Sequence, residues 1–209
     1  MTRRSRMLIP TVAVGLLAVA VIAVALALRQ RAADDAADTA RPADDVATFV
    51  TLTGEAALVD AERITVEASS HLPPAEEVTY DPGNTIDRDP LTAWNSDSPE
   101  ADGRGESLTF RFSEPVDLKG VRFIDGYAKN PEIFEANHRL RSVVVSTDQS
   151  NQMLTLLDTS DAQEIRFDFG VTSKVVLEVV DIYPGDGFAN PELTADLAVS
   201  EVSFLAVQR

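Results

Sequence analysis

Apolar and polar residues alternate along several short stretches of the chain. In 107–115, Leu108, Phe110 and Phe112 would share one face of an extended strand, and 164–170 repeats the alternation. β-branched residues dominate further stretches, at 64–68, 121–124, 141–147, 174–183 and 198–207. A period of two with β-branched enrichment predicts strands. We therefore expect an all-β domain, a sandwich or barrel, with no amphipathic helix of useful length.

Clusters of Pro, Gly, Asn and Asp separate these strands and define three long loops, at 70–107, 126–139 and 183–196. Loops longer than about 12–15 residues are usually functional or disordered. The first of them holds several prolines and Trp94, the only tryptophan of the chain, which favours an ordered loop. We expect the function of the protein to reside on these three loops.

A different pattern opens the chain. Residues 7–28 contain no charged side chain and no polar stripe, and at ~1.5 Å per residue they would span a bilayer core of roughly 30 Å. This predicts a transmembrane helix, or an uncleaved signal; cleavage after the Ala-Leu-Ala at 25–27 is the alternative. Three arginines in residues 1–6 favour a short cytoplasmic tail. We expect a single-pass protein of a bacterial cell membrane with its C-terminal domain extracytoplasmic.

Residues 29–47 consist mostly of Ala and Asp and are expected to form an acidic linker. The β-rich domain then covers residues 48–209. The formal net charge of the chain is −16, which argues against nucleic acid as a partner because its phosphates repel acidic surfaces. There is no cysteine, so the domain must be held by its core or by a hard metal ion.

Several pieces of the domain, in order, resemble a known family. They are "ASS" at 68–70, "NTIDRDPLTAW" at 84–94 and "SEVSF" at 200–204. Together they resemble the discoidin family, also called coagulation-factor type C domains. The stretches at 103–112, 120–146, 156–169 and 181–204 are similar to the discoidin-like domain of bacterial NAD-glycohydrolase toxins, a translocation or glycan-binding module. Over residues 64–207, the resemblance implies a jelly-roll β-sandwich that binds ligands through loops at one end.

The 84–94 loop is also a candidate metal site. Asp87 and Asp89 are hard oxygen donors two positions apart and Thr92 adds a hydroxyl, a set suited to structural Ca²⁺. The resemblance adds Glu201 from the last strand as a ligand, and Asn84 as a weaker candidate. The alternative is that Asp87 and Thr92 cap turns while Glu201 pairs with an arginine.

Two further positions of this loop lead to expectations. Arg88 stands where the family usually has Gly, and a left-handed backbone there would cost Arg about 1 kcal/mol or more. Trp94 is expected to plug the core beneath the loop with its N–H on a backbone carbonyl. Sugar stacking is the alternative role for this ring.

The second and third loops supply candidate ligand-binding residues. The resemblance assigns Tyr127, Lys129, Asn137 and Arg139, and Tyr183 with Phe188 could rim the same site. An aromatic ring offers a stacking face for a sugar, while Asn, Arg and Lys donate to hydroxyls and carboxylates. Internal stitching of the loop by Asn137 and Arg139, and packing by the two aromatics, are the alternatives. His138 is expected to be an isolated, exposed loop histidine.

These observations favour a binding protein over an enzyme. The sequence contains no catalytic cysteine, Gly-x-Ser-x-Gly, His-Glu-x-x-His or P-loop motif. We expect a module that binds cell-wall polysaccharide or another glycan; the alternative is a scaffold that binds a protein partner in the cell envelope. A third possibility is a stability domain without a ligand.

Overall fold

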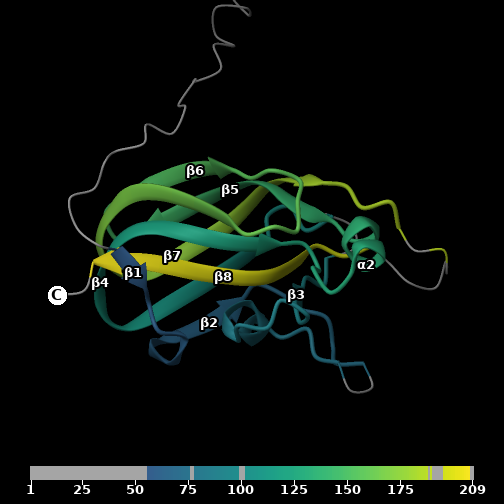
Figure 1. The fold of residues 1–209 in the computed structure, drawn as a ribbon, viewed down its shortest axis with the longest axis horizontal. Coiled ribbons are helices and arrows are strands. Elements are labelled where there is room, and N and C mark those ends of the chain that lie inside the picture. Colours follow the sequence, from purple (N-terminus) through teal and green to yellow (C-terminus); the bar gives the residue numbers. More distant parts are fainter. Residues whose placement is uncertain (1–55, 76–77, 99–101, 188, 190–194, 208–209) are drawn as a thin grey trace, which may run out of the picture. The chain divides into compact units, whose positions relative to one another are not determined.

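The computed structural model describes residues 56–75, 78–98, 102–187, 189 and 195–207. Strands dominate this part of the chain (Figure 1). They are β1 (Ala56–Leu58), β2 (Ile64–Ala68), β3 (Trp94–Asn95), β4 (Ser107–Asp125), β5 (Arg139–Thr147), β6 (Asn151–Thr155), β7 (Gln163–Tyr183) and β8 (Ala198–Val207). The helices are short: η1 (Ala61–Arg63), η2 (Pro82–Ile86) and α2 (Pro131–Ala136). The all-β prediction is confirmed.

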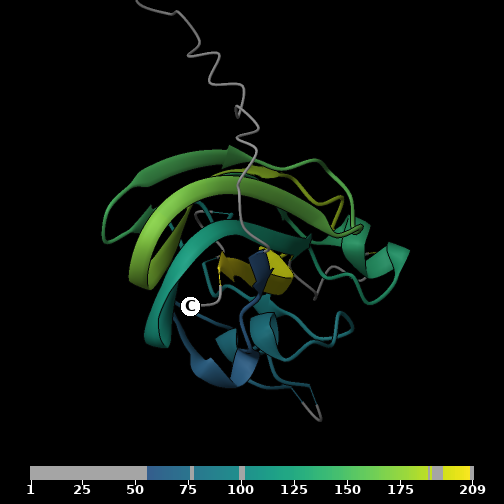
Figure 2. The ribbon, with the colours of Figure 1, turned by 60° about the vertical axis from the view of Figure 1, so that its left-hand side comes forward.

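Hydrogen bonds connect the strands in the order β1-β8-β4-β7-β5-β6, with β2 also on β4 and β3 on β8. Two strands are long enough to belong to both layers of a sandwich. The first part of β4 pairs with β2 on one side and with the second part of β7 on the other. The second part of β4 pairs with β8 on one side and with the first part of β7 on the other. Figure 2 shows both strands curving around the core.

The bends in these two strands have local causes. In β4 the pairing with β7 shifts register between Arg111 and Val116, a stretch that contains Pro115, which cannot donate to a ladder. In β7, Gly170 has a φ of 75°, and a Cβ there would come within 2.6 Å of the Gln149 side chain. Glycine is favoured at such a position because it has no Cβ.

The core lies between the two layers. The ring of Phe204 on β8 meets the edges of Phe110 and Phe112 on β4, with ring centroids 4.9 and 5.2 Å apart. All three rings are buried. Burying a phenylalanine side chain contributes roughly 1.5–3 kcal/mol, so this cluster is a major source of cohesion between the layers.

The structure corrects the predicted strand boundaries. Stretches 107–115 and 121–124 were expected as separate strands and form the single strand β4, and 164–170 and 174–183 likewise join in β7. Strands 64–68 and 198–207 have the predicted bounds. Strands β1, β3 and β6 were not predicted.

The predicted anchor at 7–28, the linker at 29–47 and Phe188 lie outside the described residues. None of the helices that the structure describes is long and apolar enough to cross a membrane.

Candidate binding site at the loop end

The helix α2 and the loops on either side of it gather at one end of the sandwich, which we call the loop end; β1 and the last residues of β8 lie at the other (Figure 1). Helix α2 starts where the Asn130 side chain accepts a hydrogen bond from the Ile133 amide at 2.9 Å and Pro131 takes the first helical position. The buried Asn137 ends it, with its side-chain amide donating to the Ile133 carbonyl at 2.9 Å.

Arg139 binds the loop end together from inside. Only 8% of this residue is exposed, and its guanidinium forms two hydrogen bonds with Asp158, at 2.6 and 3.0 Å. The same group donates to the carbonyls of Phe134, Glu135 and Asn137. Asn137 and Arg139 therefore stitch the loop internally.

The close packing around Arg139 depends on Gly126. This residue has a φ of 67°, and a Cβ there would lie 2.6 Å from the Phe134 ring and 2.9 Å from Arg139. The Arg139 guanidinium lies 5.0 Å from the centre of the Phe134 ring. The loop end is therefore a packed structure with one preferred conformation.

Asp125, at the end of β4, is a buried carboxyl behind this network. Its Oδ1 accepts a hydrogen bond from the Leu140 amide at 3.1 Å, and its Oδ2 has no hydrogen-bond partner in the described part of the chain. Burial raises the pKa of Asp125 to about 8, against the opposing effect of two backbone donors and Arg139. The carboxyl is therefore mostly protonated at neutral pH.

Tyr127 and Lys129 form a separate pair. The Tyr127 ring is buried against Ala93 and Ala198, so its faces serve packing. The Lys129 ammonium is exposed and lies 5.9 Å from the centre of that ring. Of this pair, only Lys129 presents its chemistry to solvent.

Tyr183 ends β7 opposite Arg139 on β5. Its hydroxyl donates to the Leu156 carbonyl at 3.0 Å, and the Arg141 guanidinium lies 5.8 Å from the centre of its half-buried ring. The structure thus groups Asn137, Arg139 and Tyr183 and places Tyr127 with Lys129.

Beside Tyr183 lies a charged network that sequence analysis missed. Asp181 accepts hydrogen bonds from Arg104 and from Arg141, each at 3.0 Å, and Arg104 also reaches Asp102 at 3.2 Å. The hydrogen bond from Arg104 lowers the pKa of Asp181. No sequence signal connects positions 104 and 181; alternation alone indicates that 141 points outward from its strand.

The prediction of an exposed His138 is wrong. Its side chain is 13% exposed, its Nδ1 accepts the Gly185 amide at 2.9 Å, and its Nε2 lies 4.0 Å from Asp102. Burial lowers the pKa of His138, so the neutral ring connects the second loop to the third.

Trp94 is fully buried, as predicted, and its indole N–H donates to the Ser70 carbonyl at 2.8 Å. The prediction of a core anchor is confirmed. Asn84 stabilises the same loop from within, because its side-chain amide donates to the carbonyls of Thr79 and Ala93, at 2.8 and 2.9 Å.

The candidate calcium ligands make hydrogen bonds within their loop. Asp87 accepts from the Asp89 amide and from the Thr92 hydroxyl, both at 2.8 Å, and Asp89 accepts from the Leu91 amide at 3.0 Å. These hydrogen bonds are the turn caps that we gave as the alternative to calcium binding. In the described part of the chain, no group of three or more Asp, Glu or His side chains could hold a metal ion. Hydroxyl and carbonyl oxygens would have to supply most of any calcium shell.

Glu201 completes the set and is 6% exposed. Its Oε1 is buried and has no hydrogen-bond partner in the described residues. Burial, together with the adjacent Asp87 carboxylate, raises the pKa of Glu201 to about 8 against two backbone donors, the amides of Arg88 and Asp89. Two neighbouring carboxyl groups need a shared proton or a cation between them, so this pair fits a cation. The backbone amide of Arg88 donates a hydrogen bond to Glu201. Arg88 has a left-handed backbone with a φ of 68°, the conformation that its replacement of Gly made questionable.

Comparison with known proteins identifies the class. Residues 60–205 match the NAD glycohydrolase translocation F5/8 type C domain, so the chain belongs to this family. The family is a translocation domain and not a catalytic one. No curated protein matches the chain.

Solved structures show the same fold. The family 32 carbohydrate-binding module of Clostridium perfringens NanJ, in complex with galactose, is 10% identical with a TM-score of 0.53 over 72% of this chain and 98% of that one. The F5/8 type C domain of a Bacteroides fragilis protein is 15% identical with a TM-score of 0.54, over 75% and 99%. The β-sandwich is thus consistent with the discoidin-like jelly roll.

Proposed function

We propose that this chain is a non-catalytic module that binds carbohydrate through the loop end and that residues 7–28 hold it at the outer face of a bacterial cell membrane. The observation that carries the proposal is the buried Arg139 network. Burying a guanidinium is costly unless its donors are satisfied. The hydrogen bonds that satisfy the buried Arg139 are made to loop residues, so they fix the loops rather than the core. Preorganised loops lower the entropic cost of binding.

The ligand-facing chemistry is the exposed network beside Tyr183. Arg104, Asp181 and Arg141 offer donors and acceptors in one continuous array, which suits adjacent sugar hydroxyls. Lys129 adds a second exposed donor at the loop end. The solved relative bound to galactose has the same fold and supports this class of ligand.

We also propose a structural calcium ion for the 84–94 loop. The carboxylates of Asp87 and Glu201, the Thr92 hydroxyl and oxygens of Asp89 would hold it. The buried, unpartnered Oε1 of Glu201 supports this assignment. Calcium would replace the shared proton and rigidify the loop that Trp94 anchors.

A glycan array probed with the full-length protein in detergent tests the proposal, with calcium and with EDTA. We expect binding that free sugar competes in the millimolar range and that Arg141→Ala weakens at least tenfold. Arg166→Ala is the matched control, because Arg166 pairs with Glu164 at 2.7 Å on the surface of β7 and is no part of the loop end. Absence of glycan binding, or equal loss in both variants, would contradict a lectin-like site and turn attention to a protein partner.

A further inference from the structure

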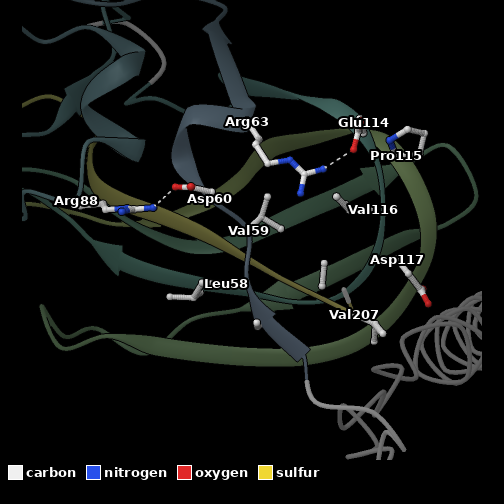
Figure 3. A pocket seen from close by; sticks show the side chains of 12 residues that line it. Leu58, Val59, Asp60, Arg63, Arg88, Glu114, Pro115, Val116, Asp117 and Val207 are labelled. Atoms are coloured by element: carbon white, nitrogen blue, oxygen red, sulfur yellow. Dashed lines mark hydrogen bonds and ion pairs between the residues drawn. The ribbon is translucent and has the colours of Figure 1, made fainter. Parts of the chain in front are cut away.

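A cavity of about 600 Å³ lies at the end of the sandwich opposite the loop end (Figure 3). Strand β1, the last residues of β8 and the bend of β4 enclose it, and its lining includes Leu58, Val59, Arg63, Arg88, Glu114 and Val207. Strand β8 has ten residues and spans about 30 Å at ~3.3 Å per residue, so Val207 in the cavity lies about that far from Ala198 at the start of the strand. This volume is typical of small-molecule sites, which measure roughly 300–1,000 Å³.

Two arginines line this cavity, and their side chains are 43% exposed for Arg63 and 67% exposed for Arg88. Figure 3 shows Arg63 extending across it toward Glu114, with Arg88 and Asp60 to one side. Each guanidinium hydrogen-bonds one carboxylate through Nη2 only: Arg63 with Glu114 at 3.2 Å, and Arg88 with Asp60. The Nε and Nη1 groups of both arginines have no hydrogen-bond partner among the described residues.

Arg88 is an unusual residue for its backbone. Its φ of 68° is the left-handed conformation that favours glycine. Its side chain lines this cavity and two smaller adjoining ones of about 220 and 120 Å³. Non-glycine residues in sparsely populated conformations cluster at functional sites. Glycine at this position would keep the backbone amide and lose only the guanidinium, so the side chain is the reason to look for a function here.

The arginines' present partners are loosely held. The side chains of Asp60 and Glu114 are 57% and 79% exposed, and exposed ion pairs contribute little to stability. The third carboxylate of the lining, Asp117, already binds Lys119 at 2.8 Å. An incoming oxyanion can therefore replace Asp60 and Glu114 as the partner of the guanidinium groups, and the displaced carboxylates become acceptors for hydroxyls.

We propose that this cavity binds a small polyhydroxylated molecule that carries one carboxylate or phosphate group. Arg63 and Arg88 hold the oxyanion, for which the planar guanidinium fork is well suited. Asp60 and Glu114 accept from hydroxyls, and Leu58, Val59 and Val207 contact the apolar face of the molecule. This site does not depend on carbohydrate binding at the loop end, although Arg88 enters it from the loop that is proposed to hold calcium.

Calorimetric titration of the full-length protein in detergent tests the site with three matched probes: glucuronate, glucose 6-phosphate and glucose. We expect at least one anionic probe to bind tenfold or more tightly than glucose, and the preferred probe distinguishes carboxylate from phosphate. Arg63→Ala and Arg88→Gly should each weaken that binding at least tenfold. Because the backbone at position 88 suits glycine, Arg88→Gly should keep the fold.

Two controls make the outcome decisive. Arg166→Ala removes a surface arginine of similar exposure, also paired with a glutamate, and should leave binding unchanged. Arg141→Ala alters the loop end and should also leave it unchanged. The proposal is overturned if neither anionic probe binds, if glucose binds as tightly, or if Arg166→Ala is as harmful. If Arg141→Ala were the only variant to lose binding of the anionic probe, the proposal would also be overturned, while the proposed function would stand.

Discussion

Replacing Asp125 with Asn should flatten the pH dependence of stability. Burial raises the pKa of Asp125 from 3.8 to about 8 in the folded protein. Well below pH 3.8 the carboxyl is protonated in both states and does not affect stability. As the pH rises toward 8, the unfolded chain releases this proton while the folded protein keeps it. The folded state is therefore progressively destabilised, and the loss levels off above the folded pKa.

The magnitude follows from the size of the shift. Each pH unit in this window costs up to about 1.4 kcal/mol, so Asp125 removes on the order of 3 kcal/mol between pH 5 and pH 7. The Asp125→Asn side chain stays neutral and can still accept the Leu140 amide. The difference in slope between the two proteins, rather than their absolute stability, therefore isolates the carboxyl.

Urea unfolding at pH 5, 6, 7 and 8 in constant EDTA provides the assay. The only tryptophan, Trp94, is fully buried and reports unfolding of this domain by fluorescence. The raised pKa of Glu201 contributes equally to both proteins and cancels in the comparison. Parallel pH profiles for wild type and Asp125→Asn would refute the reasoning.

Two further predictions concern the core and the candidate cation. Phe204→Ala should lower the free energy of unfolding by about 3–5 kcal/mol, because it removes the ring that meets Phe110 and Phe112; a loss below about 1 kcal/mol in urea titration would contradict the packing. Calcium should raise the melting temperature of the wild type over that in EDTA, and Glu201→Gln should abolish the increase. An equal calcium effect in both proteins would remove Glu201 from the site.

The sequence was sufficient to predict the all-β class, the strands 64–68 and 198–207, and the role of Trp94. Apolar alternation and β-branched residues indicate strands because one face of a sandwich layer is buried. It could not reveal that β4 is continuous, since Pro115 normally marks the end of a strand and here marks a bend.

The candidate site could be predicted only in part. The resemblance selected Asn137 and Arg139, but arginine in a loop is usually exposed, and only the fold shows that this one is buried on Asp158. The pairing of Arg104 with Asp181 depends on contacts between residues 77 positions apart. The opposite cavity arises from the meeting of β1, β4 and β8, which no local pattern encodes.

If the loop end binds carbohydrate, a bound glycan should protect its loops from exchange. Hydrogen–deuterium exchange of the full-length protein, with and without a glycan selected on the array, tests it most directly because it locates the bound surface. We predict slower exchange in residues 102–105, 126–141 and 181–187, with no change in β1 or the end of β8. Protection confined to other residues, or no protection at saturating glycan, would contradict the claim.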